Sequence, residues 1–256
     1  MKRCAHIALC GIFLSLMVSV VTPASAAVRV EPHFTMSSDP AKIAAEVLLD
    51  GNAFVFAYGT STAEKNQVVN DVQSYVDAVS VTSMTPKVKG FVVNSGKFNE
   101  EIKLVLVYGE DEFTANELSS LVSSAGKKPH SIASYLCKVL SYDSVAAGKR
   151  LDTNAPQVTA KGSLSGGKAV CQGYANSFTI LAEQAGIKSV KVRGYNGGVF
   201  HVMNVVDGGF AVDVTYSDGS GENYIMVPFA EYCERSGFEP VIDFDTAFEM
   251  KYGPSK

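Results

Sequence analysis

The stretch that decides the fold is GSLSGGKAVCQGYANSF, residues Gly162–Phe178. Its glycines and Lys168 come close to the spacing of a phosphate-binding loop, while Cys171 follows three residues later. Such a loop needs a serine or threonine after its lysine to hold magnesium, and that position is Ala169 here. The glycines therefore indicate a sharp turn with close backbone approach before a helix, rather than a nucleotide site.

A helix is expected to begin at Cys171. Tyr174, Phe178 and Leu181 recur at helical spacing, and Gly186 is typical of a helix C-terminus. A thiol at a helix N-terminus ionises more readily than a free one, which makes Cys171 a candidate nucleophile. The competing interpretation is a packing residue, because cysteine is among the most commonly buried residue types.

A nucleophilic cysteine needs a base, and the histidines beyond residue 26 are His33, His130 and His201. His33 falls in an N-terminal arm and His130 follows the polar run GKKP, whereas His201 lies within an alternating apolar stretch, VFHVMNVV. Asp213, in FAVDVTY, is the candidate for orienting the imidazole, because a carboxylate among apolar neighbours needs a partner.

The hairpin between these two stretches decides whether the imidazole and the carboxylate meet. If Asp207–Gly209 is a three-residue loop, Val206 pairs with Phe210, and His201 and Asp213 become diagonal neighbours on one face. A loop with an even number of residues would place them on opposite faces.

The N-terminus has the pattern of a secretory signal. Lys2 and Arg3 precede an apolar run over residues 7–21, and Ala24–Ala26 offers the small residues that a signal peptidase accepts. The run is shorter than the roughly 20 residues that span a bilayer. The sequence therefore predicts a signal peptide over residues 1–26, cleavage after Ala26, no membrane span, and a secreted, periplasmic or cell-surface protein.

The remaining chain is acidic and long enough for two domains. Removing Lys2 and Arg3 from 22 basic residues leaves 20 against 26 acidic residues, a formal charge of −6. The basic residues form no run, which argues against nucleic acid as a partner. We expect a small α+β domain over residues 27–114, with strands near 53–59, 88–93 and 102–108 and a helix over 61–79, followed by a catalytic domain over residues 115–256.

Three stretches together resemble the transglutaminase-like superfamily. GGKAVCQGYANSFTILAEQAGI, HVMNVV and FAVDVTYSD are similar in order, spacing and type to the family signatures G-x-x-C-x-G-Y-A, H-A-W-N and V-D-x-T-W-x-D. Met203 and Tyr216 stand where the family usually has tryptophan. We expect these two substitutions to change the substrate cleft, while Cys171, His201 and Asp213 are all present.

The resemblance implies an α+β, papain-like core, with a helix that starts at the cysteine packed on an antiparallel sheet. In that reading Cys171 is the nucleophile, His201 the general base and acid, and Asp213 the orienting carboxylate. Weaker candidates for the oxyanion site and its surroundings are Tyr142, Gln172 and Asn204. The family reaction is acyl transfer on a protein or peptide amide through a thioester, without a cofactor or metal.

Three alternatives stay open at this point. Water is the default acyl acceptor, which favours a peptidase or amidase over a cross-linking enzyme, and a binding module that keeps the fold without turnover is the alternative from another class. Cys137 and Cys233 could form a disulfide in an oxidising compartment, which would leave Cys171 free. The sequence predicts no oligomeric state.

Overall fold

A computed structural model describes residues 34–35, 39–50, 52–58, 62–80, 87–95, 99–107, 113–149, 151–152 and 154–254. The predicted signal peptide, its cleavage site and His33 lie outside these residues. Within the described ranges, no helix is long and apolar enough to cross a membrane.

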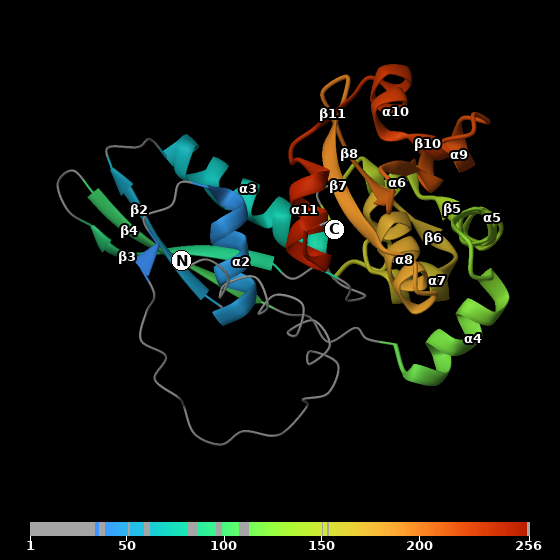
Figure 1. The fold of residues 1–256 in the computed structure, drawn as a ribbon, viewed down its shortest axis with the longest axis horizontal. Helices are drawn as coiled ribbons and strands as arrows, with labels where there is room; N and C mark the ends of the chain where they lie inside the picture. The colour runs from blue at the N-terminus through green and yellow to red at the C-terminus, as the bar shows by residue number, and fades with distance from the viewer. Residues whose placement is uncertain are drawn as a thin grey trace, which may run out of the picture.

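The N-terminal unit is a sheet with two helices packed on it (Figure 1). β4 (Asn99–Val107) pairs antiparallel with both β2 (Asn52–Tyr58) and β3 (Lys87–Ser95), and β1 (Phe34–Thr35) adds to β2 in parallel. The helices α2 (Pro40–Asp50) and α3 (Thr62–Val79) bury apolar faces against this sheet. The alternating strands and the amphipathic helix expected here are present.

The C-terminal region begins with helices and continues into a five-stranded antiparallel sheet of order β10-β9-β8-β7-β11. Its helices are α4 (Ala115–Ala125), α5 (Pro129–Val139), α6 (Ser144–Ala147), α7 (Ala160–Gly166), α8 (Cys171–Gln184), α9 (Val214–Gly219), α10 (Phe229–Ser236) and α11 (Phe244–Tyr252). The sheet strands are β7 (Ser189–Asn196), β8 (Val199–Val206), β9 (Phe210–Val212), β10 (Ile225–Pro228) and β11 (Phe238–Pro240). A short parallel pair joins β5 (Ser141–Tyr142) to β6 (Lys168–Ala169).

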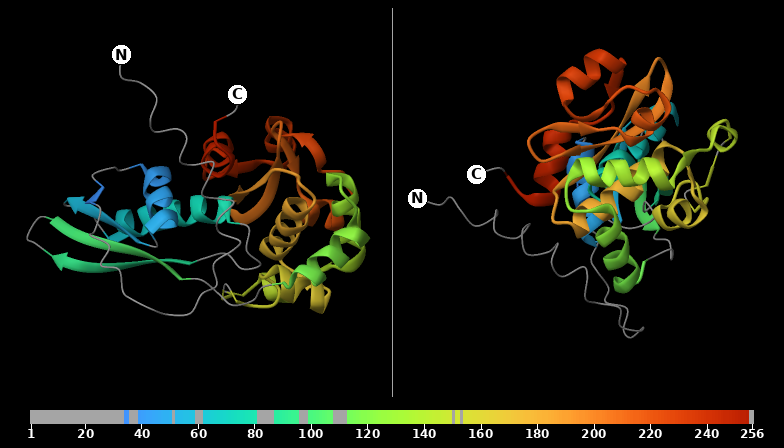
Figure 2. Two further views of the ribbon diagram at one scale, coloured as in Figure 1. Left: turned by 60° about the horizontal axis from the view of Figure 1, so that its bottom comes forward. Right: turned by 90° about the vertical axis from the view of Figure 1, so that its right-hand side faces the viewer.

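Helix α8 is the centre of this region. Every residue from Gln172 to Ala182 is buried. Figure 2 shows α8 between the green helices α4 and α5 on one side and the orange sheet strands on the other. A helix that starts at the cysteine and packs on an antiparallel sheet confirms the expected α+β fold.

The β8–β9 hairpin has the register expected for a three-residue loop. Val206 pairs with Phe210, and the ladder ends at the pair formed by Asn204 and Val212. The expectation that the strand continues through Asp213 is wrong. The Asp213 carboxylate accepts a hydrogen bond from the Tyr216 backbone N–H, 3.0 Å away, and this N-cap starts α9 in place of further strand.

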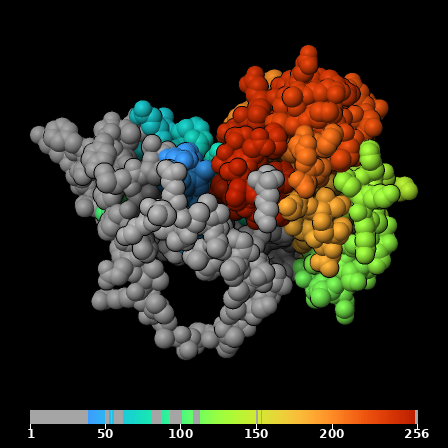
Figure 3. All heavy atoms as spheres, in the orientation of Figure 1, coloured from blue at the N-terminus to red at the C-terminus, as the bar shows by residue number. Residues whose placement is uncertain are grey.

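The two units share a packed interface. α3 packs against β7 and α11, and α11 also contacts α2. Ala78 at the end of α3 belongs to the same buried cluster as Val190 and Ala247. Figure 3 shows the red atoms of α11 lying against the blue and cyan atoms of the N-terminal unit. The division into domains at residues 114 and 115 stays a prediction.

The three cysteines among the described residues, Cys137, Cys171 and Cys233, are free thiols. The structure therefore does not contain the Cys137–Cys233 disulfide considered above.

Candidate active site

Cys171 is the first residue of α8 and is only partly buried. Val170, at the N-cap, provides no side-chain hydrogen bond to the helix, while its own N–H donates to the Gln157 carbonyl oxygen at 3.0 Å. A Cβ on Gly173 would lie 2.2 Å from that same oxygen. Glycine is required here because the preceding segment crosses the helix start in direct contact with it.

The His201 imidazole and the Asp213 carboxylate form the central pair of the site. Nε2 of His201 lies 2.7 Å from Oδ2 of Asp213, and the two residues are 4% and 1% exposed. Tyr232 donates its hydroxyl to the same Oδ2 at 2.7 Å. With the Tyr216 N–H on its other oxygen, the Asp213 carboxylate is held from three directions.

Aromatic rings hold the imidazole in place. The Tyr216 ring stacks on His201 with centroids 4.3 Å apart and planes 9° apart, and Phe238 meets it edge-on at 6.1 Å. Gly194 pairs with His201 across β7 and β8. A Cβ at Gly194 would lie 2.4 Å from the Phe238 ring, so glycine makes room for that ring.

The electrostatics favour a protonated imidazole. Burial lowers the pKa of His201, but the charge and hydrogen bond of Asp213, with a smaller contribution from hydrogen bonding to Cys171, outweigh it and raise the pKa to about 10. His201 is therefore cationic at neutral pH. Because Nε2 is bound to Asp213, Nδ1 is the ring nitrogen available to the Cys171 sulfur.

Residues 112–221 match the sequence profile of the transglutaminase-like superfamily. The chain contains a transglutaminase-like domain. The matched residues include Cys171, His201 and Asp213, and the match confirms the resemblance inferred from the three motifs.

Two solved structures are similar to this chain at low identity. A crystal structure of a TGase is 15% identical, with 64% of this chain and 51% of that chain covered and a TM-score of 0.33. A candidate cysteine protease from Cytophaga hutchinsonii is 13% identical, with 61% of this chain and 65% of that chain covered and a TM-score of 0.32. The chain thus spans less than two thirds of the length of either structure. None of the curated proteins searched matches it.

Tyr142 lies close to Cys171 and Tyr216. It is on β5, whose pairing with β6 brings it beside the strand that leads into Cys171. Burial raises the pKa of its hydroxyl, and the charges of Cys171 and Tyr216 raise it further. The half-exposed hydroxyl therefore stays protonated at neutral pH and can donate a hydrogen bond.

The other two candidates, Asn204 and Gln172, bond to neighbouring elements of the fold. Asn204 donates to the Thr179 hydroxyl at 2.8 Å and to the Ala175 carbonyl oxygen at 3.3 Å, which ties β8 to the middle of α8. The Gln172 amide is buried and bonds to Asp77, on α3. These contacts are positioning contacts within the core.

Sequence reasoning missed Tyr232, the Tyr216 ring and Asp77. Tyr232 lies 19 residues after Asp213, and nothing in its local pattern reports the contact. Asp77 carried a usable signal, because it lies between apolar positions near the end of an amphipathic helix, where a carboxylate needs a partner.

Within the described residues, no group of three or more His, Cys, Asp or Glu side chains could hold a metal ion.

Proposed function

We propose that this protein is an exported thiol enzyme that cleaves or transfers the acyl group of protein or peptide amides through a thioester on Cys171. The observation that carries the proposal is the His201 imidazole, which bonds Asp213 at 2.7 Å and also interacts with the thiol at the start of α8. The superfamily match supports it, because members are cysteine protease-like enzymes.

The first half-reaction uses the cationic imidazole. The Cys171 thiolate attacks the amide carbonyl carbon and forms a C–S bond, while the carbonyl π electrons move to the oxygen. As the tetrahedral intermediate collapses, the C–N bond breaks and His201 gives its Nδ1 proton to the leaving amine. The acyl group stays on the sulfur as a thioester, and His201 is left neutral.

The second half-reaction restores the starting state. Neutral His201 takes a proton from water, or from a primary amine, as that nucleophile attacks the thioester carbonyl. The C–S bond then breaks and Cys171 leaves as a thiolate beside the imidazolium. Water gives hydrolysis and an amine gives cross-linking. We favour hydrolysis, because water is always present at the thioester.

The oxyanion of the intermediate needs hydrogen-bond donors. The first N–H groups of a helix have no acceptor within the helix, and Val170 provides no side-chain cap. The N–H groups at the start of α8 are therefore suited to the oxyanion. The Tyr142 hydroxyl is the second donor that we propose. No metal or cofactor is needed for these steps.

Export follows from the N-terminal pattern. The basic residues, apolar run and small residues within positions 1–26 support a signal peptide and a location outside the cytoplasm.

The test is product formation from an unfolded protein offered together with a fluorescent primary amine. Ammonia or new amino termini report thioester formation, covalent fluorescence reports transfer to the amine, and the excess of the first over the second reports hydrolysis. We expect hydrolysis to exceed transfer, and Cys171→Ala to lower both at least about 10³-fold, because the nucleophile is lost. Cys233→Ala, which changes a half-buried thiol in α10, is the matched control and should keep activity. Equal turnover in Cys171→Ala would overturn the proposal.

A further inference from the structure

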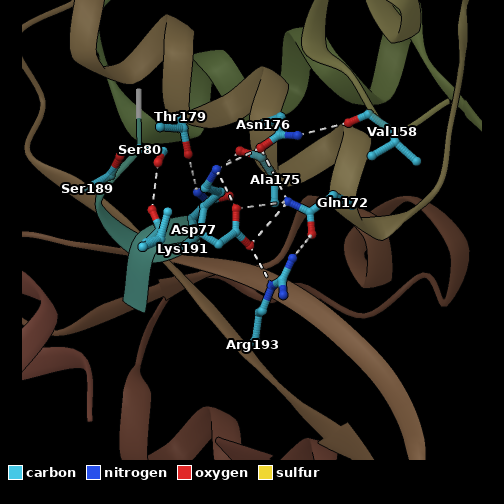
Figure 4. Close-up of polar contacts among 12 residues, drawn as sticks. Asp77, Ser80, Val158, Gln172, Ala175, Asn176, Thr179, Ser189, Lys191 and Arg193 are labelled. Carbon is cyan, nitrogen blue, oxygen red and sulfur yellow. Dashed lines mark hydrogen bonds and ion pairs between the residues drawn. The ribbon is translucent and has the colours of Figure 1, made fainter. Parts of the chain in front are cut away.

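Asp77 brings a buried carboxylate from the N-terminal unit into the core of the transglutaminase-like domain. It lies near the C-terminal end of α3 and is 0% exposed. Figure 4 shows its side chain pointing between β7 and α8. Burying a carboxylate is unfavourable unless it is paired and hydrogen-bonded, so the partners of Asp77 define what it does.

Two cations on β7 pair with this carboxylate. Lys191 Nζ lies 2.8 Å from Oδ1 of Asp77, and Arg193 Nε lies 2.6 Å from Oδ2. Positions 191 and 193 are two residues apart on the strand, so both side chains lie on the same face of the sheet. Burial lowers the pKa of Lys191, and the charge and hydrogen bond of Asp77 oppose that effect.

The same carboxylate reaches the residue next to the nucleophile. The Gln172 amide nitrogen lies 3.3 Å from each oxygen of Asp77, and its Oε1 accepts from Arg193 Nη2 at 3.5 Å. Asn176, one turn further along α8, accepts from Lys191 at 2.8 Å and donates to the Val158 carbonyl oxygen at 2.8 Å. These bonds form one network, drawn in Figure 4.

The network contacts the residue next to Cys171 and the partner strand of His201. Gln172 follows Cys171 in the first turn of α8. Arg193 precedes Gly194, which pairs directly with His201 across the sheet. A shared carboxylate between Gln172 and Arg193 therefore sets how the start of α8 lies relative to the strand that carries the imidazole.

We infer that Asp77 is a positioning residue that holds Cys171 at its working distance from His201, which makes α3 a part of the catalytic unit. This inference rests on the proposed nucleophilic role of Cys171. Asp77 acts through Gln172 and Arg193 and does not touch the substrate.

The first test variant is Gln172→Leu, which cuts the link to α8 and leaves the charges of Asp77, Lys191 and Arg193 in place. The second is Asp77→Leu with Lys191→Met, which replaces the fully buried ion pair by apolar side chains of similar volume and leaves the Arg193 guanidinium, whose side chain is 18% exposed, without its carboxylate partner. The readout is the rate of Cys171 alkylation by iodoacetamide at pH 6, with the unfolding midpoint measured beside it. We expect both variants to react about tenfold or more slowly, since a displacement of about 1 Å is enough for that loss.

The matched control is Glu183→Leu with Lys251→Met, which removes a partly buried ion pair at the other end of α8. This control should change the unfolding midpoint and keep the alkylation rate. Wild-type rates in Gln172→Leu and in the Asp77 double variant would overturn the inference and leave Asp77 as an interface residue. If alkylation of the unmodified protein does not depend on His201, the proposed function itself fails, which is a separate outcome. Gln172→Leu keeps the test decisive if the double variant does not fold.

Discussion

Replacing Asp213 by asparagine is expected to lower turnover about 10³- to 10⁴-fold while the fold is kept. The fold should persist because asparagine caps a helix as well as aspartate does, so its Oδ1 can still accept from the Tyr216 N–H and start α9. The loss therefore comes from the imidazole.

The amide introduces a donor where the carboxylate was an acceptor. Its Nδ2 would face Nε2 of His201 and the hydroxyl of Tyr232, which now lie 2.7 Å and 2.7 Å from Oδ2. To accept from an amide N–H, Nε2 must lose its proton. The ring then carries its proton on Nδ1 and is neutral, and the thiolate has lost its cationic partner.

Two measurements check this prediction. The ring protons of His201, followed by nuclear magnetic resonance, should titrate near pH 10 in the unmodified protein and near or below the ordinary value of about 6.5 in Asp213→Asn. Burial, which lowers the pKa, then acts without the opposing charge. Asp243→Asn is the control, because Asp243 caps α11 with its side chain as Asp213 caps α9, by accepting from the N–H groups of Asp245 and Thr246. A His201 pKa unchanged by Asp213→Asn would contradict the electrostatic account.

A methyl group on Gly173 is expected to destabilise the protein by about 3 kcal/mol and to displace the start of α8. The added Cβ would lie 2.2 Å from the Gln157 carbonyl oxygen and 2.4 Å from the Ser163 hydroxyl. The first of these atoms belongs to the backbone, so it cannot move aside by a side-chain rotation. The segment that crosses the helix start must shift, and Cys171 with it.

Gly166→Ala is the matched control for Gly173→Ala. A Cβ on Gly166, at the end of α7, would meet no atom within 4 Å. Chemical denaturation should show a large fall in the free energy of unfolding for Gly173→Ala and little change for Gly166→Ala. Equal free energies of unfolding for the two variants would show that the segment containing Gln157 does not contact Gly173 closely enough to exclude a Cβ.

The local patterns predicted the elements with a clear periodicity, which are α3, the strands β2, β3 and β4, the helix α8 and the β8–β9 hairpin. The apolar stripe after Cys171 predicted the buried helix, and the length of the Asp207–Gly209 loop predicted the register in which Val206 pairs with Phe210. These features depend on residues close together in the sequence, whose periodicity reports which face is buried. The prediction that the strand continues through Asp213 was wrong. The Asp213 carboxylate accepts from the Tyr216 N–H three residues later, and this capping hydrogen bond starts a helix there.

The missed contacts join residues that are far apart in the sequence. Asp77 meets Gln172 across 95 positions, and one sequence holds no record of which distant strand or helix it will face. The buried carboxylate could be recognised as needing a partner, but the partner came only from the packing of α3 against β7. Tyr232 reached Asp213 in the same way, through the placement of α10.

The most direct test of a histidine-activated nucleophile is the pH dependence of Cys171 alkylation, measured by peptide mass spectrometry in the unmodified protein and in His201→Ala. An ordinary thiol is only about 0.3% ionised at pH 6 and reacts slowly there. We expect fast labelling of Cys171 at pH 6 in the unmodified protein and a loss of about 10²-fold in His201→Ala, because the imidazolium no longer stabilises the thiolate. Labelling no faster than a model thiol, and unchanged by the substitution, would contradict it and favour a binding module that keeps the fold without turnover.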